Sequence, residues 1–147
     1  MIKYVKMEEC HVPQVADLEK ACFSDPWSEN AVRSELTNPL SLWVVAVDGD
    51  CVAGYVGSQS VLGESDMMNL AVREEYRRTG IGACLVRELV EKLRAAGNYQ
   101  LTLEVRLSNV AAINLYLKMG FQHVGKRPNY YHNPKEDALI LRKEWEV

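Results

Sequence analysis

The stretch NLAVREEYRRTGIGACLVRELV, residues 69–90, decides the fold class, because it joins a predicted strand directly to a predicted helix. Residues 67–72 are typical of a strand, and residues 81–96 place leucine and valine at three- and four-residue steps, the spacing of a helix with one apolar face. Gly97 stands where such a helix commonly ends. A strand, a turn and a long helix together indicate one unit of an α/β domain.

The turn between strand and helix, Arg73 to Ala83, contains glycines at alternate positions, Gly80 and Gly82. Amides in the first turn of a helix point to one place, and the helix dipole adds positive charge there, so the turn predicts a site for a pyrophosphate-sized anion. An ordinary exposed turn with basic residues fits the two glycines equally well. The Gly-Lys-Ser/Thr ending of a Walker loop is missing. Leu85 stands where a dinucleotide fingerprint requires a third glycine, which disfavours a nicotinamide-dependent oxidoreductase.

Outward from this unit, apolar periodicity and turn residues predict the other elements. Before it we expect a strand over 2–6, helices over 12–22 and from about 28 to 36, and a hairpin over 42–61. After it we expect a strand over 101–105, a helix over 109–119, and strands near 121–124 and 138–141. Hairpins followed by strand–helix units predict one domain, residues 1–147, with a mixed α/β sheet and helices on its faces.

The composition is that of a globular chain: 147 residues, 48% hydrophobic and 25% charged. The net charge is −3 and no run of five like charges occurs, so nucleic-acid binding through phosphate neutralisation is disfavoured. The longest apolar stretch, residues 42–47, is too short to cross a bilayer, and the first residues contain no leader-like apolar segment. We therefore expect a cytoplasmic protein with no membrane partner.

The 4 cysteines contain no Cys-x-x-Cys pair, and we expect them to be buried free thiols. They are Cys10, Cys22, Cys51 and Cys84. The 3 histidines lack metal-ligand spacing, so we expect no metal.

Glu104 and Tyr116 are candidate polar groups of a cleft. Within residues 101–107 the apolar side chains share one strand face, so Glu104 points to the other face, where a glutamate is unusual. An ion pair or an exposed edge position explains Glu104 as well. Asn109 and Tyr116 are seven residues apart on one helical stripe and can face one cleft. The alternative for Tyr116 is a core tyrosine whose hydroxyl bonds the backbone.

The segment RRTGIG, residues 77–82, resembles the Arg/Gln-x-x-Gly-x-Gly/Ala signature of the Gcn5-related N-acetyltransferases (GNAT), which bind the pyrophosphate of acetyl-coenzyme A (acetyl-CoA). Further segments, in order and spacing, are similar to the RimI-type enzymes of that superfamily, which acetylate the N-terminal alanine of a small-subunit ribosomal protein. They are FSDPWSE (23–29), NLAV (69–72), LEVRLSNVAAINLYLKMGF (103–121) and RPNYY (127–131). The resemblance covers about residues 4–143. It implies a single GNAT-like α/β (α+β) domain with a twisted, mixed, mostly antiparallel sheet and helices on both faces.

The resemblance also implies roles for individual residues. The glutamate of LEVR falls on Glu104, as general base. The tyrosine of NLYLKMGF falls on Tyr116, as the acid that protonates the leaving thiolate. Contacts to acetyl-CoA fall on Leu70, Ala71, Val72, Arg78, Thr79, Gly80, Ile81, Gly82, Ala83 and Asn109. Trp27 and Tyr131, the latter in a predicted Pro/Asn-rich loop, are candidate acceptor contacts, and a purely structural role for each is equally open.

The implied reaction is direct transfer from acetyl-CoA to the N-terminus of a ribosomal protein in a ternary complex, without a metal, by a monomer or weak dimer. An α-amine, with a pKa near 8, is easier to deprotonate than a lysine side chain, with a pKa near 10.4. An acetyltransferase of lysines or small amines is the alternative within the fold. A non-catalytic acyl-CoA-binding module is the alternative from another class, although such a module needs neither Glu104 nor Tyr116.

Overall fold

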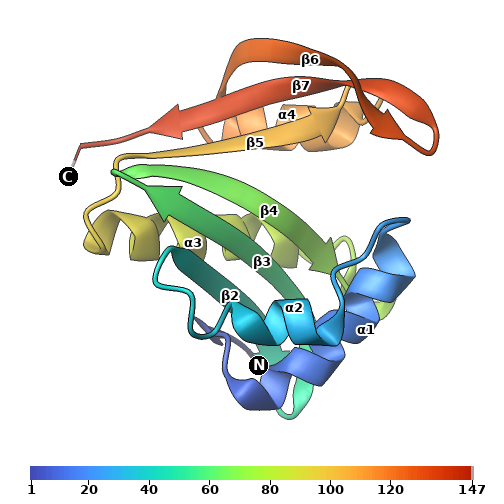
Figure 1. Ribbon diagram of the computed structural model, residues 1–147, viewed down its shortest axis with the longest axis vertical. Helices are drawn as coiled ribbons and strands as arrows, with labels where there is room; N and C mark the ends of the chain where they lie inside the picture. Colours follow the sequence, from blue (N-terminus) through green and yellow to red (C-terminus); the bar gives the residue numbers. More distant parts are fainter. Residues whose placement is uncertain (147) are drawn as a thin grey trace.

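Seven strands pair in the order β1-β2-β3-β4-β5-β7-β6, in the computed structural model that describes residues 1–146 (Figure 1). The strands are β1 (Ile2–Lys6), β2 (Ser41–Asp48), β3 (Cys51–Val61), β4 (Glu64–Val72), β5 (Gln100–Arg106), β6 (Gln122–His132) and β7 (Lys135–Glu144). The α-helices are α1 (Val12–Cys22), α2 (Glu29–Ser34), α3 (Ile81–Ala95) and α4 (Val110–Lys118). Short 3-10 helices, η1 (Glu9–His11) and η2 (Glu74–Tyr76), precede α1 and α3. β4 and β5 are parallel and the other neighbours antiparallel, which confirms the mixed, mostly antiparallel sheet.

The helices cover both faces of the sheet, as predicted. Val44 and Ala46 of β2 belong to the apolar layer under α3, whereas Trp43 and Val45 belong to the layer under α1 and α2. This alternation follows from the strand period of two, because successive side chains point to opposite faces. The buried stripe of α3, including Leu85, occupies the first layer.

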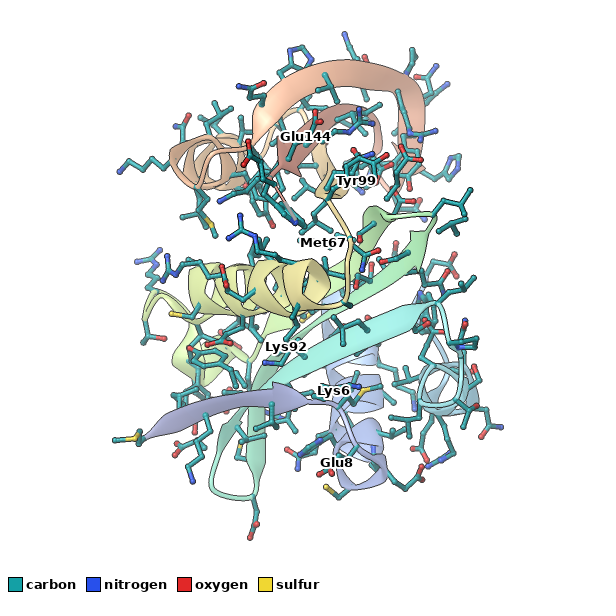
Figure 2. All side chains as sticks on the ribbon, turned by 90° about the vertical axis from the view of Figure 1, so that its left-hand side faces the viewer. Lys6, Glu8, Met67, Lys92, Tyr99 and Glu144 are labelled. Atoms are coloured by element: carbon teal, nitrogen blue, oxygen red, sulfur yellow. The ribbon has the colours of Figure 1, made fainter. Side chains whose placement is uncertain are left out.

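β4 and β5 pair only near their beginnings. The last paired residues are Asp66 and Thr102, after which β4 continues to Val72 and β5 to Arg106 on diverging paths (Figure 1). Met67, the next residue of β4, lies between the α3 layer and the part of the molecule built from α4 and β5–β7 (Figure 2). Within residues 1–146, the facing edges of β4 and β5 therefore have no strand partner beyond this point.

Three predicted element boundaries are wrong. β4 begins at Glu64 instead of 67, because a turn at Leu62 and Gly63, both with positive φ, joins it to β3 as a hairpin. β6 and β7 are longer than predicted, and the segment 127–131 lies within β6 instead of a loop. β6 is an edge strand whose register to β7 shifts between Arg127 and Tyr131, and an edge or a bulge tolerates the proline at 128.

The cysteines are free thiols, but the expectation that they are buried is wrong. Cys10 is exposed on η1, and Cys22, Cys51 and Cys84 are partly exposed. None of the described helices is long and apolar enough to cross a membrane.

Candidate active site

The first turn of α3 offers unpaired backbone amides. Gly80 precedes the helix with a φ of +83°, and Arg78 has a φ of +64°, so the chain turns sharply before α3. No side chain caps the helix, and within residues 1–146 the amides of Ile81, Gly82 and Ala83 donate no hydrogen bond. A Cβ atom added at Gly82 would meet only Val72 Cγ2, at 3.8 Å. The turn therefore has the open amides at a helix N-terminus that the predicted anion site requires, and the site itself stays a prediction.

The two arginines of this turn have different surroundings. Arg77 Nε donates to the carbonyl oxygen of Val72 at 3.0 Å, and Arg77 Nη2 lies 3.7 Å from Cys22 Sγ. Arg78 is exposed and forms no ion pair within residues 1–146, so its guanidinium is available to a ligand. The Thr79 hydroxyl donates to the carbonyl of Tyr76 and holds the turn.

The end of β4 presents backbone groups along its free edge. The amide of Arg73 bonds the carbonyl of Ala53, toward β3. Because backbone groups alternate between the two sides of an antiparallel strand, those of Val72 and Leu70 point to the edge that faces β5. Ala71 points its side chain into the layer under α1. An extended ligand can therefore pair with the backbone of Leu70 and with the amide of Val72, whose carbonyl already accepts from Arg77 Nε.

Glu104 lies in β5, beyond its last pair with β4. Its side chain is 19% exposed, and its Oε1 lies 3.2 Å from Arg127 Nε of β6. The neighbouring Leu103 and Val105 are buried in the layer under α3, which confirms the predicted alternation. The ion pair considered from the sequence is thus formed, and the carboxylate is still reachable from solvent.

Tyr116 lies in α4 with its ring buried and its hydroxyl free. The ring packs edge-on against Phe121, with centroids 5.4 Å apart. The hydroxyl has no hydrogen-bond partner among the described residues, unlike that of a core tyrosine bonded to the backbone. Burial, and then the neighbouring Tyr131, raise the pKa of Tyr116 to about 12. Tyr116 therefore stays protonated and can donate over the whole physiological pH range.

Tyr131 is an electrostatic neighbour of both groups. Its ring stacks under the Arg106 guanidinium, whose central carbon is 4.3 Å from the ring centroid. Burial raises the pKa of Tyr131 to about 12, with smaller contributions from Tyr130 and Glu104. Since Tyr131 is an electrostatic neighbour of both Glu104 and Tyr116, the structure brings the two candidate groups to one region.

Asn109 and Trp27, which are predicted to contact acetyl-CoA and the acceptor, also have structural roles. Asn109 is the N-cap of α4, and its Oδ1 accepts from the Ala112 amide at 3.2 Å, which leaves its amide nitrogen for a ligand. Trp27 is half-buried and packs edge-on against Trp43, with centroids 5.4 Å apart. Ile81 is buried, so only its backbone is accessible to a cofactor.

The sequence reasoning missed Glu19, whose carboxylate is completely buried in α1. It accepts hydrogen bonds from the Trp27 amide, the Asn69 side chain and the Tyr55 hydroxyl. The signal was available: position 19 continues the apolar stripe of Val12, seven residues later, so a charged residue there indicates a buried polar site.

In the described part of the chain, Glu8, Cys10 and His11 form a cluster that could in principle bind a metal ion. Their potential ligand atoms lie within 4.8 Å of one another. The group is on the surface, and His11 Nδ1 already accepts from the Glu8 amide at 2.9 Å. The cluster is therefore accounted for as the cap of η1.

Comparison with known proteins connects this geometry to an activity. Residues 12–121 match the family model described as "Acetyltransferase (GNAT) family". The chain is 34% identical over 137 residues to the [ribosomal protein bS18]-alanine N-acetyltransferase of Escherichia coli K12, covering 92% of each. It is 38% identical over 136 residues to the N-alpha-acetyltransferase RimI of Mycobacterium tuberculosis, covering 88% of this chain and 84% of that one. The crystal structure of the ribosomal-protein-S18-alanine N-acetyltransferase from E. coli superimposes with a TM-score of 0.90 at 32% identity, covering 100% of this chain and 96% of that chain.

Proposed function

Because the chain belongs to the GNAT family of acetyltransferases and is an acetyl-CoA-dependent N-acetyltransferase, we propose that its acceptor is the N-terminal alanine of a small-subunit ribosomal protein. The E. coli relative acts on such an alanine by its name, and the mycobacterial relative is an N-alpha-acetyltransferase. The observation that carries the proposal is the similarity to these two relatives, which extends over 92% and 88% of this chain. The free Tyr116 hydroxyl and the reachable Glu104 carboxylate are the groups that the reaction requires. The enzyme acts in the cytoplasm as a monomer or weak dimer, without a nucleic-acid or membrane partner.

The described residues fit acetyl-CoA at two places. The open amides of residues 81–83, with Arg78 beside them, suit a pyrophosphate, and Thr79 and Gly80 shape that turn. The free edge at Leu70 and Val72 suits the amides of the pantetheine arm, as an added strand would. When bound, acetyl-CoA supplies an acetyl thioester.

The two side chains handle the protons. An α-amine with a pKa near 8 is partly protonated at neutral pH and must lose a proton before it attacks. Glu104 takes that proton, directly or through a water molecule, and so frees the lone pair with which the nitrogen forms the nitrogen–carbon bond. The nitrogen releases a second proton to water as the amide forms, and Tyr116 later regains a proton from water. Tyr116 gives its proton to the sulfur as the carbon–sulfur bond breaks. Each transfer typically contributes about 10²- to 10⁴-fold to the rate.

The test is intact-mass analysis of peptides incubated with the protein and acetyl-CoA. The panel contains a ribosomal peptide with a free N-terminal alanine, the same peptide N-blocked but with a lysine, and a polyamine. We expect one acetyl group on the free α-amine alone. In Glu104→Gln we expect the rate of acetylation to fall by a factor of about 10² or more. Glu144→Gln is the matched control, because Glu144 lies exposed at the far end of β7 (Figure 2).

Other outcomes would reject the proposal in different ways. Modification of the blocked peptide or the polyamine would indicate a lysine or small-amine acetyltransferase. Coenzyme A binding without any product would indicate an acyl-CoA-binding module.

A further inference from the structure

Glu19 is a buried carboxylate whose hydrogen-bond donors are all uncharged. Its Oε1 accepts from the Trp27 amide at 2.9 Å, and its two oxygens accept from Asn69 Nδ2 at 3.0 and 2.9 Å. The Tyr55 hydroxyl donates to Oε2. Burial of a charged group is unfavourable even when its hydrogen bonds are satisfied, and a well-packed apolar side chain serves stability as well or better. Packing alone therefore does not explain a carboxylate at this position.

The Asn69 side of this cluster supports an irregular part of β4. The β3–β4 register shifts between Val56 and Ser58, so that Met68 and Asn69 of β4 lie opposite Gly57 alone and form a bulge. The bulge immediately precedes Leu70 and Val72, whose backbone faces the diverging edge. A bulge interrupts the ladder, and the hydrogen bonds from Asn69 to both Glu19 oxygens hold the strand where that ladder is broken.

The Trp27 side of the cluster fixes the segment between α1 and α2, residues 23–28. The Trp27 amide donates to Glu19, eight residues earlier in the chain, while its ring packs against Trp43. Glu19 therefore accepts hydrogen bonds from two parts of the proposed site. One is segment 23–28, which contains the proposed acceptor contact Trp27, and the other is β4, beside which acetyl-CoA is proposed to bind.

We propose that Glu19 is a positioning residue that aligns segment 23–28, on the acceptor side, with the β4 bulge, on the donor side. The inference rests on the proposed function for the identity of the two sides. Glu19 touches neither substrate. It acts through the Trp27 amide and the Asn69 side chain.

The substitution Glu19→Gln tests the proposal. It replaces one acceptor oxygen with an NH₂ donor. The Tyr55 hydroxyl can turn and accept from that donor, but Asn69 Nδ2 cannot, so Asn69 loses one of its two hydrogen bonds and the acceptor of the Trp27 amide loses its charge. Loss of one buried hydrogen bond to a charged acceptor corresponds to about a tenfold effect or more. We expect the KM for the acceptor peptide to rise about tenfold, and the Kd for coenzyme A to stay within about twofold, because the α3 amides are unchanged.

The double variant Glu19→Gln/Asn69→Asp restores a donor–acceptor pair between the two positions and should recover part of the acceptor KM. Glu35→Gln is the matched control. Glu35 is also buried and accepts from Trp43, Gln59 and Asn38, but within residues 1–146 it accepts no hydrogen bond from residues 23–28 or from β4. An unchanged acceptor KM in Glu19→Gln, or an equal rise in Glu35→Gln, would overturn the proposal.

Amide hydrogen exchange provides a readout that does not depend on the acceptor. Coenzyme A should slow exchange in residues 23–28 of the wild type, and this protection should be lost in Glu19→Gln. Asn69→Ala cuts the link on the β4 side alone and should have the same effect if Glu19→Gln does not fold. Equal protection in wild type and variant would refute the alignment. A wild type that acetylates no α-amine but shows the expected exchange would refute only the proposed function.

Discussion

At the scale of single residues, the Tyr116 hydroxyl is a polar group placed against an apolar ring without a partner of its own. The hydroxyl is not among the buried polar atoms without a partner in residues 1–146, so it is reachable by water or by a ligand. Phenylalanine would pack the same ring, so packing does not require the hydroxyl, and we expect it to serve a ligand.

Replacing Tyr116 with phenylalanine should therefore separate activity from stability. We expect kcat for the α-amine acceptor to fall about 10²-fold or more, because the leaving sulfur loses its proton donor. The Kd of coenzyme A should not rise, and the urea concentration at the unfolding midpoint should not fall. Steady-state rates and urea titrations measure these quantities. Tyr99→Phe is the control, since Tyr99 is exposed and directly precedes β5. An unchanged kcat in Tyr116→Phe would remove Tyr116 from the mechanism.

The sequence predicts some of these residues and not others, for physical reasons. Strand alternation is a local property, so the sequence correctly predicts that Glu104 points away from the apolar face. The sequence does not predict its partner, because Arg127 lies in another strand, whose register depends on a bulge. The reading of Glu104 and Tyr116 as base and acid came from family resemblance. Spacing alone left a core tyrosine and a surface ion pair open.

At the scale of elements, the turn into α3 combines a left-handed residue with open amides. The φ of +83° at Gly80 is a conformation that a side chain makes unfavourable by roughly 1 to 2 kcal/mol. The turn therefore depends on glycine for its shape, and the shape determines where the amides of α3 point.

The substitution Gly80→Ala should lower the free energy of unfolding by about 1 kcal/mol and also weaken coenzyme A binding. Gly49→Ala is a matched control, because Gly49 has a φ of +60° in the β2–β3 turn and open space around it. The control should lose similar stability but keep its affinity for coenzyme A by calorimetry. Equal affinities in the two variants would mean that the turn holds no pyrophosphate.

Elements with strong periodicity were predicted well, and those that depend on pairing were not. The helices 12–22 and 81–96 follow their apolar stripes closely. The segment RPNYY has loop residues, yet it is strand because β7 pairs with β6 on either side of a bulge. Such pairing is a long-range effect that local propensity does not contain.

At the scale of the whole molecule, buried tyrosines with raised pKa values make the stability of the fold depend on pH in alkaline solution. Tyr116 and Tyr131 have pKa values raised to about 12, in each case first by burial. Burial, and then the hydrogen bond to Glu19, also raise the pKa of Tyr55. In the unfolded chain these groups titrate near 10.

The free energy of unfolding should therefore fall in strongly alkaline solution. Between about pH 10 and 12 the native state keeps tyrosine protons that the unfolded state has already released, so stability that is complete below about pH 10 decreases as the pH rises. Urea titrations across this range measure the slope. The double variant Tyr116→Phe/Tyr131→Phe should have a shallower slope, and an identical slope would contradict the assignment.

The divergence of β4 and β5 also has a consequence for the lifetime of the protein in a cell. Unpaired strand edges are places where a second chain can add, which starts aggregation, and an extended ligand that occupies them closes that route. A ligand present at about 100 times its Kd adds roughly 2.7 kcal/mol to the free energy of unfolding. Depletion of both coenzyme A and acetyl-CoA should therefore shorten the half-life of the enzyme, because either one can occupy these edges.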